Sequence, residues 1–176
     1  SALEEVKRHS EESIKAIEEL VRRVEKHSRE SSKRNEELIR EVEDHSRRVI
    51  EELKRKKADR EARELVKEDE RRVKEVAEES RRLSKRNEEL VRRIAREIER
   101  LSEENERLVK AVLRTLSEDV VRAAEKLLEE DRDAVRRAKE KLDELLKRDR
   151  DSSREAIREL ERLLKETRDV LREVER

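Results

Sequence analysis

The chain has 176 residues, of which 57% are charged and 31% hydrophobic, a composition typical of long amphipathic helices. Fifty basic residues balance fifty acidic ones, so no net charge would attract nucleic acid or an anionic membrane. The sequence lacks Gly, Pro, Cys, Met, Phe, Tyr and Trp, which excludes disulfides, cysteine metal sites and aromatic platforms for base stacking. No apolar run approaches the roughly 18–20 residues that span a bilayer, and no signal peptide is visible.

The first predicted helix covers about residues 2–56. Ser1 followed three residues later by Glu4 is a capping box, which indicates that a helix starts here. Apolar or small residues then recur at intervals of three and four for about fifty residues, the pattern of a single helix face. The pattern lapses across residues 54–59, where a basic helix end precedes Asp59 as a candidate N-cap. We place the first turn there.

The second and third predicted helices cover about residues 60–116 and 119–175. Each has its own apolar stripe with the same three-and-four spacing. Between them, Ser117, Glu118 and Asp119 are residue types that cap helices, and we place the second turn there. The three-and-four spacing of apolar residues continues across this point almost without interruption, so one continuous helix is the alternative.

An eighteen-residue repeat runs through all three helices. It is clearest at His9, His27 and His45, each of which is followed by Ser. Eighteen residues make five turns, so the repeat calls for nearly straight helices, whereas a seven-residue repeat would supercoil them. Each helix would be roughly 80 Å long at about 1.5 Å per residue. We therefore expect an all-α, straight, antiparallel three-helix bundle that forms a single domain over residues 1–176.

Polar residues interrupt the apolar face of each helix. When the chain is folded at these two turns, the polar residues of the three helices lie at the same heights along the bundle axis. Projection at about 100° per residue puts Ser, Asn and Asp at the face centres, with each His roughly 75° from the centre of its face. We expect Ser, Asn and Asp to meet at the bundle axis, while a partly exposed His closes each network from the side. The expected core polar layers are His9, Ser10, Asn105 and Asp131; His27, Ser28, Asn87 and Asp149; and His45, Ser46, Asp69 and Thr167.

Such layers favour a structural role. A buried polar group without a partner costs about 1–3 kcal/mol, so a layer penalises every register that separates its members. The chain resembles de novo designed parametric helical bundles with buried hydrogen-bond networks. The resemblance rests on the missing residue types, the eighteen-residue repeat and the polar layers. The turns differ from those designs because they lack Gly and Pro. The resemblance implies a scaffold or assembly building block without a natural biochemical activity.

The histidines also raise three chemical alternatives. A hydrolase would need a nucleophile oriented by His and Asp, but His9 and Ser10 are adjacent on a helix and point about 100° apart. A zinc site needs three or four converging ligands, whereas each layer offers one His and one Asp. A pH switch stays open, because acid would break a layer in which His accepts a hydrogen bond and tighten one in which His only donates. The alternative function is thus a pH-responsive oligomer that disassembles in acid.

Partners and localisation are weakly encoded. We expect no enzyme activity, cofactor or metal, and no nucleic-acid, membrane or small-molecule partner. Ile14, Ile50 and Leu113 lie at face edges where they can reach another chain, so self-association stays open. A monomer is slightly favoured because no second apolar stripe lies outside the core. We expect a soluble protein, made by recombinant expression in the cytoplasm, with no localisation signal.

Overall fold

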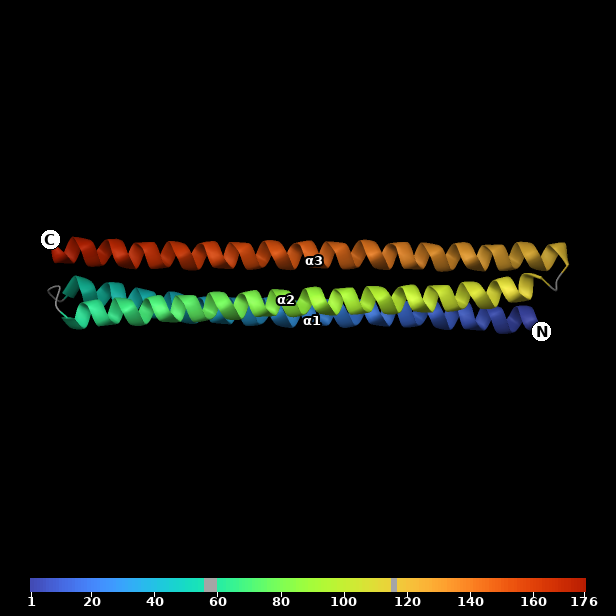
Figure 1. The fold of residues 1–176 in the computed structure, drawn as a ribbon, viewed down its shortest axis with the longest axis horizontal. Coiled ribbons are helices and arrows are strands. Elements are labelled where there is room, and N and C mark those ends of the chain that lie inside the picture. Colours follow the sequence, from blue (N-terminus) through green and yellow to red (C-terminus); the bar gives the residue numbers. More distant parts are fainter. Residues whose placement is uncertain (56–59, 115–116) are drawn as a thin grey trace. The chain divides into compact units, whose positions relative to one another are not determined.

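The structure is a computed structural model that describes residues 1–55, 60–114 and 117–176. Its three helices are α1 (Ala2–Arg55), α2 (Arg60–Leu113) and α3 (Glu118–Glu175) (Figure 1). They confirm the predicted all-α fold with three long helices.

The helix ends lie close to the predicted ones. At the start of α1, the backbone amide of Glu4 donates to Ser1 Oγ at 3.4 Å, and the N-terminal amine lies 3.5 Å from Glu4 Oε2. This reciprocal pair is the capping box. The sequence predicts that α2 extends to residue 116, whereas it ends at Leu113. The candidate cap Asp59 lies outside the described residues, as do the predicted end of the first helix at residue 56 and residues 115–116.

The second turn separates two helices, so the alternative of one continuous helix is wrong. The carbonyl of Ser117 accepts hydrogen bonds from the backbone amides of Val120 and Val121 at 3.1 and 3.0 Å. Helix α3 therefore begins at Glu118, one residue before its predicted start. Glu118 and Asp119 lie in its first turn, where carboxylates interact favourably with the positive end of the helix dipole.

Two compact units divide the chain, and each contains a segment of all three helices. The first unit comprises residues 1–28 and 87–147, and the second comprises residues 29–86 and 148–176. That the whole chain forms a single domain stays a prediction.

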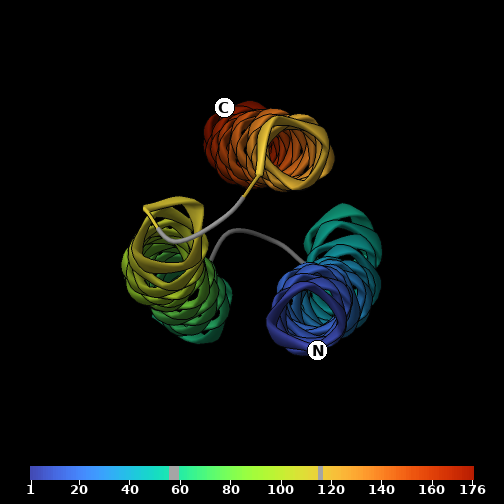
Figure 2. The ribbon, with the colours of Figure 1, turned by 90° about the vertical axis from the view of Figure 1, so that its right-hand side faces the viewer.

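In the first unit, contacts establish an antiparallel arrangement. His9 lies beside Asn105 and His27 beside Asn87, so α1 and α2 run in opposite directions. Lys139 binds Glu99 and Arg132 binds Glu106, so α3 is antiparallel to α2 as well. Seen end-on, the three helix segments form the corners of a triangle (Figure 2). The apolar core has two clusters, one of Val6, Val109, Ala124 and Leu128, and a larger one that includes Ile17, Ile98 and Leu142.

The second unit has the same construction. His45 lies beside Asp69, and Arg34 lies beside Glu79, so α1 and α2 are again antiparallel. Helix α3 is antiparallel to α2 because Arg168 binds Glu70 while Arg63 binds Glu175. The second unit has two apolar clusters. One contains Val42, Val73, Ala77 and Leu160, and the other contains Val49, Leu53, Ala62 and Val66. In each unit a polar layer lies between two apolar clusters along the helices.

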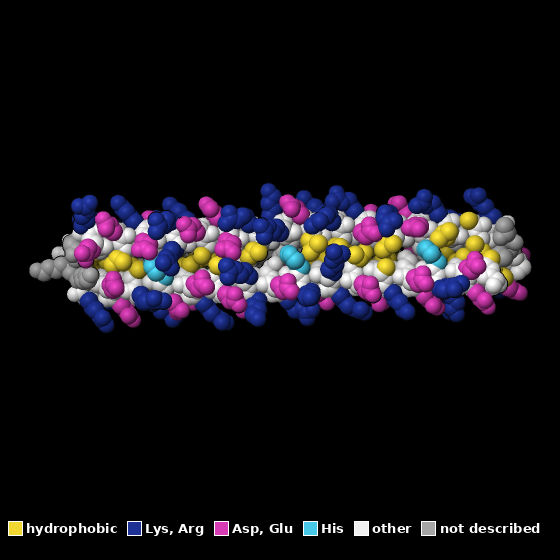
Figure 3. Space-filling view, turned by 90° about the horizontal axis from the view of Figure 1, so that it is seen from below, with side chains coloured by type: hydrophobic (Ala, Val, Ile, Leu, Met, Phe, Trp, Pro, Cys, Tyr) yellow, Lys and Arg dark blue, Asp and Glu magenta, His cyan; other side chains and the backbone are white. Residues whose placement is uncertain are grey.

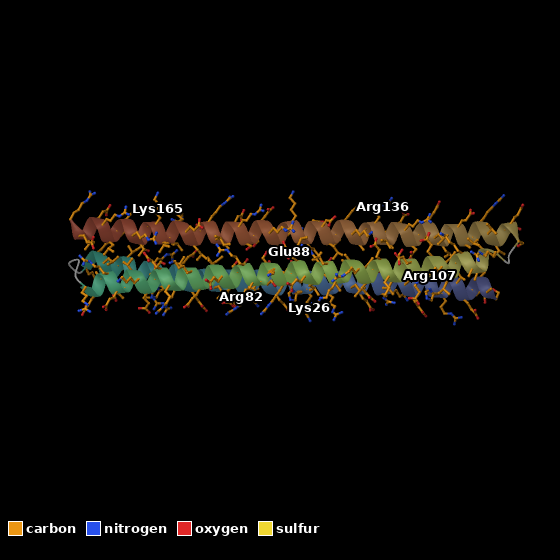
Figure 4. All side chains as sticks on the ribbon, in the orientation of Figure 1. Lys26, Arg82, Glu88, Arg107, Arg136 and Lys165 are labelled. Carbon is orange, nitrogen blue, oxygen red and sulfur yellow. The ribbon has the colours of Figure 1, made fainter. Side chains whose placement is uncertain are left out.

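The outer surface carries the charged residues. Side chains such as Lys26, Arg107 and Arg136 project away from the helices (Figure 4). Many of them form ion pairs three or four residues apart within a helix, such as Arg100 with Glu104. Exposed pairs of this kind stabilise a fold by only about 0.3–0.5 kcal/mol each, so the core holds the helices together. Within the described residues, no helix is long and apolar enough to cross a membrane.

Candidate functional site

The first polar layer lies in the first unit and centres on Asn105, whose side chain is fully buried. Ser10 Oγ donates to Asn105 Oδ1 at 3.0 Å, and His9 Nδ1 lies 3.1 Å from the same oxygen. Ser10 and Asp131 are each only 1% exposed, whereas His9 is partly exposed at the flank of α1. One amide oxygen of α2 therefore binds two neighbouring side chains of α1.

Asp131 brings a carboxylate from α3 into this layer. Burial raises the pKa of Asp131, and the neighbouring Ser102 hydroxyl and Asn105 side chain oppose that rise by favouring the charged form. Ser102 Oγ donates to Asp131 Oδ2 at 3.1 Å. Ser102 is thus a layer member that the sequence analysis did not assign. Its signal was the eighteen-residue repeat, which places Ser84 and Ser102 at equivalent positions of α2.

The direction of the Asn105 amide decides which groups donate in this layer. The amide oxygen Oδ1 faces α1, where Ser10 Oγ and His9 Nδ1 both contact it. His9 Nδ1 must therefore carry a proton and donate to Asn105 Oδ1. Among the described residues, Asn105 Nδ2 and Asp131 Oδ1 are buried and make no hydrogen bond within 3.5 Å.

The third layer, in the second unit, replaces the amide with a carboxylate. Asp69 is fully buried, and its Oδ1 accepts from His45 Nδ1 and from Ser46 Oγ, both at 2.9 Å. A carboxylate only accepts, so His45 also donates from Nδ1. Thr167 is buried on α3, but its hydroxyl donates to the carbonyl of Leu163, four residues earlier, at 2.9 Å. Asp69 Oδ2 has no hydrogen-bond partner among the described residues.

The four residues assigned to the middle layer divide between the units. In the first unit, His27 Nδ1 lies 2.6 Å from Asn87 Oδ1, and both Asn87 and Ser28 are buried. Asp149 belongs to the second unit, where it is 8% exposed. The level that the repeat assigns to all four residues stays a prediction.

Further buried polar groups occur outside the assigned layers. In the second unit, the hydroxyl oxygens of Ser80 and Ser153 lie 3.4 Å apart and form a hydrogen bond between α2 and α3. Asn35 in the second unit and Ser13 in the first are also buried, and within the described residues Asn35 Oδ1 and Ser13 Oγ have no partner. Small polar residues therefore line the core more widely than the three histidine-marked levels.

The geometry does not suit acid–base chemistry. A nucleophilic serine passes its proton to a neighbouring histidine, whereas Ser10 and His9 both donate to Asn105 Oδ1. Ser10 is also buried, so a substrate has no access to its hydroxyl. Within the described residues, no group of three or more His, Asp or Glu side chains could hold a metal ion. The first and third layers join α1 to α2 by hydrogen bonds from Ser10 to Asn105 and from Ser46 to Asp69.

Comparison with known proteins shows the fold. No protein-family model and no curated protein matches this chain. A solved structure described as "Computationally designed three helix bundle" matches it with a TM-score of 0.62 and 16% sequence identity. The match covers 98% of this chain and 87% of that one. At this identity the likeness shows the architecture alone: the chain folds as a three-helix bundle.

Proposed function

We propose that the protein is a de novo designed structural scaffold or assembly building block, without a biochemical activity, whose polar layers specify register and topology. The observation that carries this proposal is the placement of the first and third layers. Each has a fully buried α2 side chain, Asn105 or Asp69, that binds adjacent residues of α1 between two apolar clusters. The missing Gly, Pro and aromatic residues and the designed structural neighbour support the designed origin.

A shift of one helix shows how a layer enforces register. If α1 slid by one turn, Asp69 would face an apolar position such as Val42 or Val49 in place of Ser46. The buried carboxylate would then lose two donors, at a cost of several kcal/mol for an unpaired buried charge. An all-apolar core carries no such penalty, because one aliphatic contact replaces another. The layers therefore separate the native register from its neighbours in energy.

The test replaces the third layer with apolar residues of similar volume. We expect the double variant Ser46→Val/Asp69→Leu to stay helical and to unfold at the same or a higher denaturant concentration. We also expect it to lose its single register, so that its amide NMR spectrum broadens or doubles while that of the parent shows one set of signals. The matched control is Val42→Leu/Val73→Leu, which changes apolar volume and leaves the layer intact. A less stable variant with one sharp set of signals would contradict the proposal.

The pH-responsive oligomer is the alternative function, and it requires that acid break the layers. In both fully described layers the histidine donates from Nδ1, and a protonated ring keeps that donor. Acid would therefore leave the contact with Asn105 in place and turn the contact of His45 with Asp69 into an ion pair. This geometry favours the scaffold over the switch.

A further inference from the structure

The first unit has a basic surface groove between α1 and α2. The groove has a volume of about 560 Å³, and its apolar lining consists of Leu20, Leu90 and Ile94. Its charged lining consists of Arg23, Arg93, Arg96, Arg100 and Glu97. We call this the basic groove. Four arginines against one glutamate give it a strong positive charge on a chain that has no net charge.

Most of this positive charge is not neutralised within the chain. Arg100 binds Glu97 through two nitrogens, at 3.1 and 2.5 Å, and also lies 3.4 Å from Glu104. The same contact lowers the pKa of Glu97, so the only acid in the groove is already paired. Arg23, Arg93 and Arg96 are exposed, and they form no ion pair with any residue that the structure describes.

The second unit has an equivalent groove, also between α1 and α2, with a volume of about 510 Å³. Its apolar lining follows the eighteen-residue repeat, because Leu38 corresponds to Leu20 and Val76 corresponds to Ile94. Figure 3 shows hydrophobic side chains in bands between rows of charged ones on this face of α1 and α2. The repeat has therefore kept two of the three apolar lining residues, whereas Arg72 takes the position of Leu90.

Two charges of the groove lining are reversed between the two repeats. Arg23 and Arg93 of the basic groove correspond, eighteen residues away, to Glu41 and Glu75 in the lining of the second groove. In the second groove Arg34 binds Glu79, and Arg72 binds Glu68. Within the described residues, its unpaired lining charges are Glu41, Glu75 and Arg71, which leaves an acidic excess. We call it the acidic groove.

We infer that the basic groove of one copy binds the acidic groove of a second copy. The two surfaces have equivalent helices, similar apolar floors and opposite unpaired charges, which is the complementarity that selects one partner and orients it. Leu20 and Leu90, half-buried in the basic groove, would be covered by the second chain. A like-charged pairing of two basic grooves is disfavoured because six unpaired arginines would meet. The inference stands whether or not the chain was designed as a building block.

The first measurement is the molar mass of the full chain by light scattering on a sizing column. At about 100 µM and low salt, well above the micromolar dissociation constant of a modest specific interface, we expect at least two chain masses of 21.3 kDa. We expect association to weaken as added salt screens the exposed charges. A mass of one chain under these conditions would overturn the inference.

Charge exchange identifies the grooves. In Arg23→Glu/Arg93→Glu both grooves become acidic, and in Glu41→Arg/Glu75→Arg both become basic. Each variant alone should be monomeric, and an equimolar mixture should associate again, because opposite grooves are restored between unlike chains. The matched control is Arg136→Glu/Lys165→Glu, which alters two exposed side chains on α3 that point away from α1 and α2 (Figure 4).

The outcomes separate the grooves from a general effect of charge. The control should keep the mass of the parent, and circular dichroism should show that all variants remain helical. Folded variants that stay monomeric when mixed, or a control that dissociates as fully as the groove variants, would overturn the inference.

Discussion

At the scale of single residues, Asp131 shows that a polar layer costs stability as well as adding specificity. Burial raises the pKa of its carboxyl above the unfolded value of about 3.9. The stability linked to its protonation is fully present below that unfolded value and is lost as the pH rises through the folded pKa. Burial of the charged Asp131 carboxylate therefore opposes folding at pH values above its folded pKa.

The substitution Asp131→Asn removes this buried charge but keeps a side-chain oxygen that can accept from Ser102. We expect the free energy of unfolding at pH 7 to rise by on the order of 1 kcal/mol, and the gain to shrink at pH 4. Guanidinium denaturation followed by circular dichroism at both pH values measures the difference. The control Asp143→Asn, at an exposed position of α3, should change little. A variant less stable than the parent at pH 7 would show that the carboxylate is better satisfied than its burial suggests.

The position of each polar residue on its helix face could be calculated from the sequence, but the hydrogen bonds of its side chain could not. Periodicity alone puts Ser10 and Asn105 at the centres of their faces, and their polar atoms lie 3.0 Å apart in the structure. Periodicity does not say that the Thr167 hydroxyl turns back to the carbonyl of Leu163, because threonine can always bond to its own helix. It also does not say that the Ser102 hydroxyl reaches Asp131 from the edge of the α2 face. Side-chain rotamers decide these contacts, and a repeat fixes only directions.

At the scale of helices, the sequence predicted nearly everything about the elements and less about their ends. Three-and-four spacing defined each helix, since no Gly or Pro interrupts the stripes. The second turn was ambiguous because the three-and-four spacing of apolar residues continues through Ser117. This spacing alone does not distinguish a turn from a continuous helix. The structure shows the physical signal there: the Ser117 carbonyl accepts the first amides of α3, next to two acidic residues at the helix start.

Hydrogen bonds between helices should matter more than bonds within one helix. Ser46 donates from α1 to a buried carboxylate on α2, so Ser46→Ala should lower the free energy of unfolding by about 1.5–3 kcal/mol. Among the described residues, the Thr167 hydroxyl bonds only to the Leu163 carbonyl of its own helix, so the isosteric Thr167→Val should change stability by less than about 1 kcal/mol. Chemical denaturation of the two variants tests this contrast. Equal losses would mean that Thr167 supports the layer through a contact other than its hydroxyl bond.

At the scale of the whole molecule, the donor geometry of the histidines sets the response to acid. His9 and His45 donate from Nδ1 in the neutral ring, and protonation at Nε2 adds a charge without removing that donor. The His45 side chain is 16% exposed, so water can reach the ring when it becomes charged. The layers should therefore persist in mild acid.

We accordingly expect the same molar mass and the same helicity at pH 7.5 and pH 5, measured by light scattering and circular dichroism. The control is His9→Asn/His45→Asn, which keeps a donor at the flank of each layer and cannot become charged, and it should match the parent at both pH values. If the parent loses mass or helicity at pH 5 and this variant does not, the histidines act as acid-sensitive acceptors. That result would favour the pH-responsive oligomer over the scaffold as the function, because protonation disrupts these layers only where the histidines accept hydrogen bonds.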